Sequence, residues 1–184
     1  QIALDDGIPV SFGILTGFKD ETYGRDGYTR FVPPDDAYDR DKVARNLRGA
    51  GPMTPPGARS GAPSTWRYPA LDLLRETLAT IPPTTRKVLF FVPYHKVLLN
   101  PDGTEGAEVW NECKRRVAAL AETTPNSVAV DFMRPSPITE NDDNYWDSLH
   151  FTVAVADRLA RGLAAANAGQ ASDDFVVLGR SPAR

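Results

Sequence analysis

The sequence is poor in the residue types that most often build metal and redox sites. Its 184 residues include a single cysteine, Cys113, and only two histidines, His95 and His150. One cysteine cannot form an internal disulfide or a cysteine-rich metal site. Two histidines so far apart in the sequence do not have the spacing of zinc ligands. We therefore expect neither a bound metal nor a cofactor.

The sequence also lacks an excess of charge of one sign and a long hydrophobic run. Lys and Arg number 21 against 24 Asp and Glu, which gives a net charge of −3. This mild and mixed charge does not point to a nucleic acid or an anionic membrane as a partner. No apolar run reaches the roughly 18 residues of a membrane span. A hydrophobic fraction of 41% is nevertheless enough for a packed core.

Regular patterning is absent from much of the first third of the chain. The segment 17–64 is crowded with Gly, Pro and Asp, which interrupt both helical and strand periodicity. It predicts a long loop, with a weak helical pattern at Tyr38–Leu47. A loop of this length in a compact domain is typically functional or disordered. Before it, the apolar stretch Ile8–Leu15 is expected to form a buried strand or an apolar loop edge.

After residue 64 the sequence alternates between helical and strand patterns. The expected elements are helices at 68–80, 105–122 and 152–165, strands at 87–94 and 127–132, and a late apolar run at 175–178. This alternation predicts an α/β fold with parallel strands. A doubly covered sheet typically has about five or six strands. Further strands are therefore expected from elsewhere.

One of the two histidines stands in a pattern with chemical meaning. Asp147 precedes His150 by three positions, just before the helix expected from Thr152. Residues three apart at a turn or helix start project to the same side, so the carboxylate can accept from the imidazole Nδ1–H. This contact would leave Nε2 to take a proton from a nucleophile. The alternative is a helix cap made by Asp147 or Ser148, with His150 as a partly buried loop residue.

Four stretches between Val88 and Leu163 carry a family resemblance. They read FFVPYH, WNECKRRVAALAE, SVAVDF and NYWDSLHFTVAVADRLARGL. Together they resemble the C-terminal half of SGNH/GDSL-type hydrolases, most of all bacterial proteins linked to acyl modification of cell-surface polysaccharides. The resemblance implies a partial flavodoxin-like three-layer α/β/α fold whose N-terminal strands are missing. It also matches Asp147 and His150 to the Asp and His of the family's Ser-His-Asp triad.

The nucleophile and oxyanion motifs of that family have no counterpart in this sequence. Ser11 lacks the flanking glycine-acid pattern, and the G-x-N-D block is absent. Ser181 follows a strand-like run and a glycine, but its use would require a circular permutation and no helix follows it. We therefore expect residues 1–184 to form a single incomplete domain with a loop insertion at about 17–64. The nucleophilic serine is expected upstream of Gln1.

The resemblance implies an esterase or O-acyltransferase that acts on ester groups, most simply O-acetyl groups of a carbohydrate. The expected partner is a small-molecule or carbohydrate ester, with no nucleic acid and with membrane contact only through an upstream anchor. By analogy the protein would act outside the cytoplasm, in the periplasm or cell envelope. This chain by itself is expected to be inactive. The alternative is a catalytically inactive domain of the same fold that binds a glycan or a protein.

Two further residues are expected to bind substrate. His95 follows the strand at 87–94 and would lie at the carboxyl end of the sheet, where open α/β sheets place their sites. The alternative for His95 is a loop histidine that bonds to the backbone. Trp146 adjoins Asp147, and its alternative role is a core or helix anchor. The acidic loop 140–144 lacks the glycine and the bidentate glutamate of a calcium loop.

Overall fold

The computed structural model describes residues 37–54 and 61–182. The chain divides into two units, Gln1–Tyr38 and Asp39–Arg184, and the elements below all belong to the second. The expected strand at Ile8–Leu15 and most of the expected loop at 17–64 lie outside the described residues. The expectation of one incomplete domain over residues 1–184 stays a prediction.

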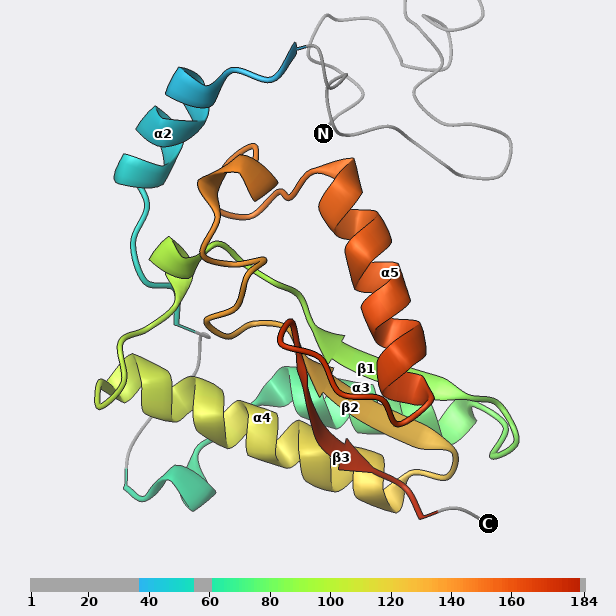
Figure 1. The fold of residues 1–184 in the computed structure, drawn as a ribbon. Helices are drawn as coiled ribbons and strands as arrows, with labels where there is room; N and C mark the ends of the chain where they lie inside the picture. Colours follow the sequence, from blue (N-terminus) through green and yellow to red (C-terminus); the bar gives the residue numbers. More distant parts are fainter. Residues whose placement is uncertain (1–36, 55–60, 183–184) are drawn as a thin grey trace, which may run out of the picture. The chain divides into compact units, whose positions relative to one another are not determined.

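The described part contains four α-helices and three strands (Figure 1). The helices are α2 (Arg40–Arg48), α3 (Pro69–Thr80), α4 (Glu105–Thr123) and α5 (Val153–Asn167), the strands are β1 (Lys87–Phe91), β2 (Ser127–Asp131) and β3 (Val176–Arg180), and the short 3-10 turns are η3 (Pro63–Thr65), η4 (Lys96–Leu98) and η5 (Asp142–Asn144). The α/β class predicted from the sequence is confirmed. The helices and strands expected after residue 64 are all present, and the first strand ends three residues earlier than expected, shortly before Pro93.

The three strands form one sheet in the order β1-β2-β3. β1 and β2 are parallel, from the pair Lys87 and Ser127 to the pair Phe91 and Asp131. β3 is antiparallel to β2, so the prediction of parallel strands is wrong for β3. The cause lies in the connection 168–175, which runs back along the sheet after α5 and enters β3 beside the carboxyl end of β2 (Figure 1).

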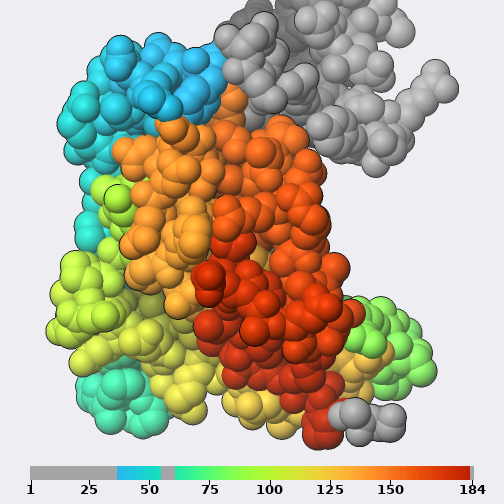
Figure 2. Space-filling view, in the orientation of Figure 1, coloured from blue at the N-terminus to red at the C-terminus, as the bar shows by residue number. Residues whose placement is uncertain are grey.

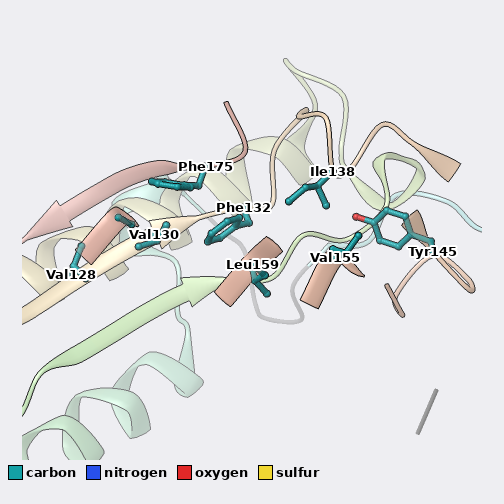
Figure 3. Close-up of a cluster of buried hydrophobic side chains, with 9 residues drawn as sticks. Val128, Val130, Phe132, Ile138, Tyr145, Val155, Leu159 and Phe175 are labelled. Atoms are coloured by element: carbon teal, nitrogen blue, oxygen red, sulfur yellow. The ribbon is translucent and has the colours of Figure 1, made fainter. Parts of the chain in front are cut away.

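Helices cover both faces of the sheet. Successive side chains of a strand point to opposite faces, and β2 is buried throughout. Val128 and Val130 pack in a core with Leu159 of α5 (Figure 3). Ala129 points the other way, into a core with Val117 of α4. The sheet is therefore the middle layer, between α5 on one side and α4 with α3 on the other.

The contact between α4 and β3 depends on a glycine. A Cβ atom placed on Gly179 would lie 2.6 Å from the backbone oxygen of Ala118 in α4. This spacing is too short for any side chain, and a backbone neighbour cannot rotate away. Gly179 therefore sets how closely the edge strand approaches the helical layer.

Candidate functional site

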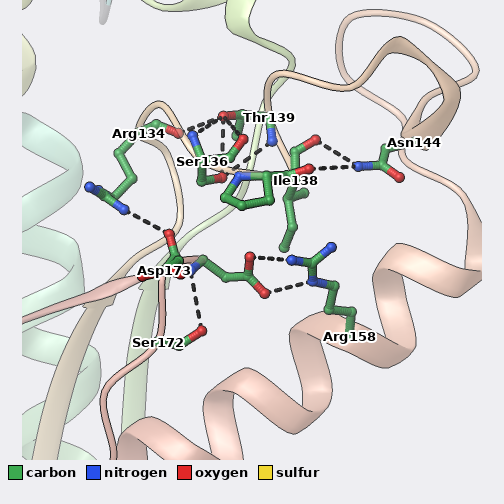
Figure 4. Close-up of polar contacts among 10 residues, drawn as sticks. Arg134, Ser136, Ile138, Thr139, Asn144, Arg158, Ser172 and Asp173 are labelled. Atoms are coloured by element: carbon green, nitrogen blue, oxygen red, sulfur yellow. Dashed lines mark hydrogen bonds and ion pairs between the residues drawn. The ribbon is translucent and has the colours of Figure 1, made fainter.

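The loop that carries the predicted residues is held by hydrogen bonds within itself. It follows the carboxyl end of β2 and spans residues 133–152. Its first turn is closed by Thr139, whose Oγ1 donates to the carbonyl of Arg134 at 2.6 Å. Further along, the side-chain amide of Asn144 donates to the carbonyl of Ile138 at 2.8 Å. Figure 4 shows how these bonds fold the loop onto itself.

The end of this loop is a tight antiparallel turn. Tyr145 and Phe151 form an isolated β-bridge, and the backbone N–H of Trp146 donates to the carbonyl of His150 at 2.8 Å. These contacts join the segment before Asp147 to the segment after it. The turn therefore fixes where the predicted pair stands.

A buried tyrosine anchors the turn to the loop that follows β1. The side chain of Tyr145 is fully buried, and its hydroxyl donates to the carbonyl of Pro93 at 2.7 Å. Burial raises the pKa of this phenol well above its usual value. Nearby, the backbone N–H of His95 donates to the carbonyl of Ser148 at 3.1 Å. The two loops at the carboxyl ends of β1 and β2 are thus fastened together.

Asp147 and His150 form the contact that the sequence predicts for an orienting carboxylate and its histidine. The distance between His150 Nδ1 and Asp147 Oδ2 is 2.8 Å. The other carboxylate oxygen of Asp147 accepts from the backbone N–H groups of Leu149 at 2.8 Å and His150 at 2.9 Å. The imidazole side chain is 66% exposed and the carboxylate 37%. Among the described residues, no hydrogen-bond partner is found for His150 Nε2.

The hydrogen bonds to Asp147 keep it charged. Partial burial alone would raise the pKa of this carboxyl group. The bond from the His150 ring and those from the backbone of Leu149 and His150 more than offset it, so the pKa lies below its ordinary value. A carboxylate that stays ionised can hold Nδ1 protonated, which leaves the Nε2 lone pair for a proton.

The helix-cap alternative does not describe the observed geometry. α5 begins at Val153 with Thr152 as its N-cap, and no side chain makes a cap bond there. The backbone bonds of Asp147 go to the turn before the helix. The carboxylate therefore serves the turn and the imidazole, and does not serve α5.

The structure buries His95 and occupies both of its ring nitrogens. Nδ1 accepts from the backbone N–H of Val97 at 3.2 Å, so Nε2 carries the proton and donates to Asp142 Oδ1 at 3.0 Å. The ring packs edge-to-face on Tyr145 with 5.1 Å between centroids. This arrangement suits a structural role close to the backbone-bonded alternative. Substrate contact by His95 stays a prediction.

Trp146 lies in the turn itself, next to the pair and half-buried. Its carbonyl accepts from the side-chain amide of Asn46 in α2 at 3.4 Å. Arg40, also in α2, forms an ion pair with Asp143 of η5. Figure 2 shows the loop, drawn in orange, at the surface beside α2 in blue. A role for Trp146 in substrate binding stays a prediction, and the contact of α2 with this loop was not expected.

The pair stands on an exposed part of the surface. Three well-formed pockets among the described residues have volumes of about 470, 490 and 500 Å³, and neither Asp147 nor His150 lines any of these three. Within the same residues, no serine or threonine hydroxyl bonds to the imidazole. The described residues therefore present an oriented, exposed imidazole to which no hydroxyl group is bonded.

Ser181 is held at the other end of the sheet. Its Oγ accepts from the backbone N–H of Ser127, the first residue of β2, at 2.9 Å. The candidate pair follows the carboxyl end of this strand, so Ser181 and His150 belong to opposite ends. Ser11 lies outside the described residues.

A buried charged pair at the carboxyl end of β2 was missed in the sequence. Lys114 Nζ lies 2.7 Å from Asp131 Oδ2 and donates to the carbonyl of Met133 at 2.6 Å. Burial raises the pKa of Asp131, and the attraction of Lys114 offsets only part of this. The pair ties α4 to the start of the loop. Strand periodicity alone could not reveal it, because Asp131 ends an otherwise apolar run.

Metal and membrane signatures are absent from the part of the chain that the structure describes. No group of three or more His, Cys, Asp or Glu side chains there is arranged to hold a metal ion. None of the helices in these residues has the length and apolar character needed to cross a membrane.

Comparison with known proteins finds no similar protein. The chain matches no protein-family model, no curated protein and no solved structure.

Proposed function

We propose that this chain contributes the His-Asp part of an SGNH-like esterase or O-acyltransferase. Its substrate would be an ester, most simply an O-acetyl group on a carbohydrate, cleaved by a Ser-His-Asp mechanism. The serine would come from outside residues 1–184. The observation that carries the proposal is the 2.8 Å contact between His150 Nδ1 and Asp147 Oδ2, on an exposed imidazole.

In the proposed mechanism each partner has its own role, which the observed contact supports. His150 would accept the hydroxyl proton of the serine on Nε2 as the nucleophile attacks the ester carbonyl. It would then donate this proton to the leaving alcohol. Asp147 would hold the Nδ1–H tautomer and stabilise the imidazolium that forms between the two steps. Because its pKa is lowered, the carboxylate is ionised at neutral pH.

The position of Asp147 and His150 in the fold supports the same proposal. β1, α4 and β2 form a parallel strand-helix-strand unit, and the pair follows β2 at the carboxyl end of the sheet. Open α/β sheets place their ligands at that end. The finer proposal is a flavodoxin-like fold in which further strands complete the sheet. Action outside the cytoplasm is part of the proposal, by analogy with the resembling family.

A second candidate is a catalytically inactive domain that binds a glycan or a protein. It is favoured by two observations on the described residues: no hydroxyl group bonds to His150, and the pair lines none of the three pockets of about 470 to 500 Å³ described above. An oriented imidazole can also bind without catalysing.

Turnover of p-nitrophenyl acetate by the full-length protein separates the two candidates. His150→Ala should lower kcat/KM by about 10³-fold or more, because the proton acceptor is lost. Arg161→Gln, a change on the exposed face of α5, serves as the matched control and should retain the wild-type rate. Equal rates for wild type and His150→Ala would overturn the enzymatic proposal and favour the binding domain.

A further inference from the structure

The hollow between α3 and α4 gathers arginine side chains. It has a volume of about 470 Å³, and we call it the arginine pocket. It is lined by Trp66, Arg67, Tyr68, Leu71, Asp72 and Arg75 on one side and by Arg115, Arg116, Ala119, Leu120 and Thr123 of α4 on the other. Four guanidinium groups thus line one pocket with a single carboxylate. This is unexpected on a chain with a net charge of −3.

One of the four arginines builds the wall of the pocket. Arg116 donates to the carbonyls of Trp66 at 2.8 Å, Ser64 at 3.0 Å and Pro63 at 3.1 Å. Its guanidinium also stacks on the ring of Tyr68 at 4.9 Å. These contacts fix the turn that precedes α3. The pocket is therefore formed before any ligand arrives.

A second carboxylate, that of Glu112, is shared by two of the pocket arginines. Buried Glu112 accepts from Arg115 at 2.8 and 2.7 Å and from Arg116 at 2.7 Å. The bonds from Arg115, and after them those from Arg116, lower the pKa of Glu112 in spite of its burial. One carboxylate facing two guanidinium groups leaves an excess of positive charge.

Two further guanidinium groups retain donors for a ligand. Arg67 is exposed and has no hydrogen bond or ion pair among the described residues. Arg75 pairs through one nitrogen with Asp72 at 2.8 Å, with both side chains 63% exposed. Such surface pairs are weak and exchange readily. Together with the remaining nitrogen of Arg115, donors from three separate segments surround the pocket.

From this arrangement we infer that the arginine pocket binds a small organic or inorganic anion with at least two negatively charged oxygen groups. Planar guanidinium groups bind carboxylate and phosphate oxygens in pairs. The volume lies in the range of small-ligand sites. The apolar floor of Leu71, Ala119 and Leu120 suits the carbon skeleton of such a ligand. The pocket lies on the face of the sheet away from α5 and is independent of the His150 proposal.

Calorimetric titration of the full-length protein in a phosphate-free buffer tests this inference. Pyrophosphate and citrate are the two probes, and they distinguish phosphate from carboxylate recognition. At least one should bind saturably, and sodium chloride at matched ionic strength should give no saturable signal. The double variant Arg67→Gln/Arg75→Gln should weaken binding by about tenfold or more, since charged hydrogen bonds are lost.

Arg161→Gln on α5 is the control for a general change of charge and should bind like the wild type. Arg67 and Arg75 are both exposed, so the double variant is expected to fold. Its circular dichroism spectrum will verify this. Absence of saturable binding by both probes would overturn the inference. Equal affinity of the double variant and the control would overturn it as well.

Discussion

Asp147 concentrates most of the polar contacts of the candidate site. Its two oxygens accept one bond from the His150 ring and two from the backbone. The same carboxylate therefore shapes the turn and selects the imidazole tautomer. Sequence spacing could predict the contact with His150, because residues three apart meet at a turn. The two backbone bonds require the exact turn, which spacing alone does not specify.

This residue should also leave a mark on the pH dependence of stability. The folded-state pKa of Asp147 is lowered, so its contribution is present above the unfolded value of about 3.9 and is lost as pH falls through the folded value. The Asp147 side chain is 37% exposed, so solvent screens its contacts and Asp147→Asn should cost only about 0.5 to 1 kcal/mol in the free energy of unfolding at pH 7. Guanidinium denaturation at pH 7 and pH 3 measures this.

The difference between wild type and Asp147→Asn should be smaller at pH 3 than at pH 7, because at pH 3 the unfolded chain already binds a proton at this carboxyl group and the advantage of the charged form is being lost. A difference that is equal or larger at pH 3 would contradict the role given to the charged form.

For His95 the sequence pattern predicts the position of the residue but not its burial. Its place after β1 correctly predicts that it lies at the carboxyl end of the sheet. Its burial depends on Tyr145, Val97 and Asp142, which contact it from the next turn and from another loop. The contacts of Asp142 and Tyr145 come from a loop far along the chain, and a single sequence does not reveal them.

At the scale of elements, hydrophobic periodicity predicts correctly whether a segment forms a helix or a strand. It does not predict whether a strand runs parallel or antiparallel to its neighbour. The apolar runs at β1 and β2 predict buried strands, and their alternation with helices predicts a parallel pair. The run at 175–178 has the same character but forms an antiparallel edge strand. Direction is set by the connection 168–175. Arg158 fastens this connection to α5 through two bonds to Asp174, at 2.6 and 2.5 Å.

The fit of β3 against α4 provides a test at this scale. Gly179→Ala places a Cβ atom 2.6 Å from a backbone oxygen of α4, so strand and helix must separate. We expect a loss of about 1–3 kcal/mol in the free energy of unfolding, typical of an overpacked core. Urea denaturation gives this value.

Gly51→Ala is the matched control, since a Cβ atom there meets nothing within 4 Å. It should change stability by no more than about 0.5 kcal/mol. Equal effects of the two substitutions would show that the close approach of β3 to α4 is not a packing constraint.

At the scale of the whole molecule, the described part presents three layers with two chemically distinct surfaces. The loop after β2 carries an oriented imidazole, and the α3–α4 layer carries the arginine pocket. The α/β class, the order of elements and the Asp147–His150 contact could be predicted from the sequence. The arginine pocket could not, because its residues lie on two helices and a turn that only folding brings together.

The central proposal assigns His150 to the activation of a serine elsewhere in the protein. A fluorophosphonate tests this most directly, because an activated serine displaces fluoride and forms a stable bond from its oxygen to phosphorus. Mass spectrometry of the full-length protein should show one adduct per wild-type chain, on a serine outside residues 1–184. His150→Ala should react about 10³-fold more slowly. Equal labelling of both proteins, or no labelling of the wild type, would contradict the account.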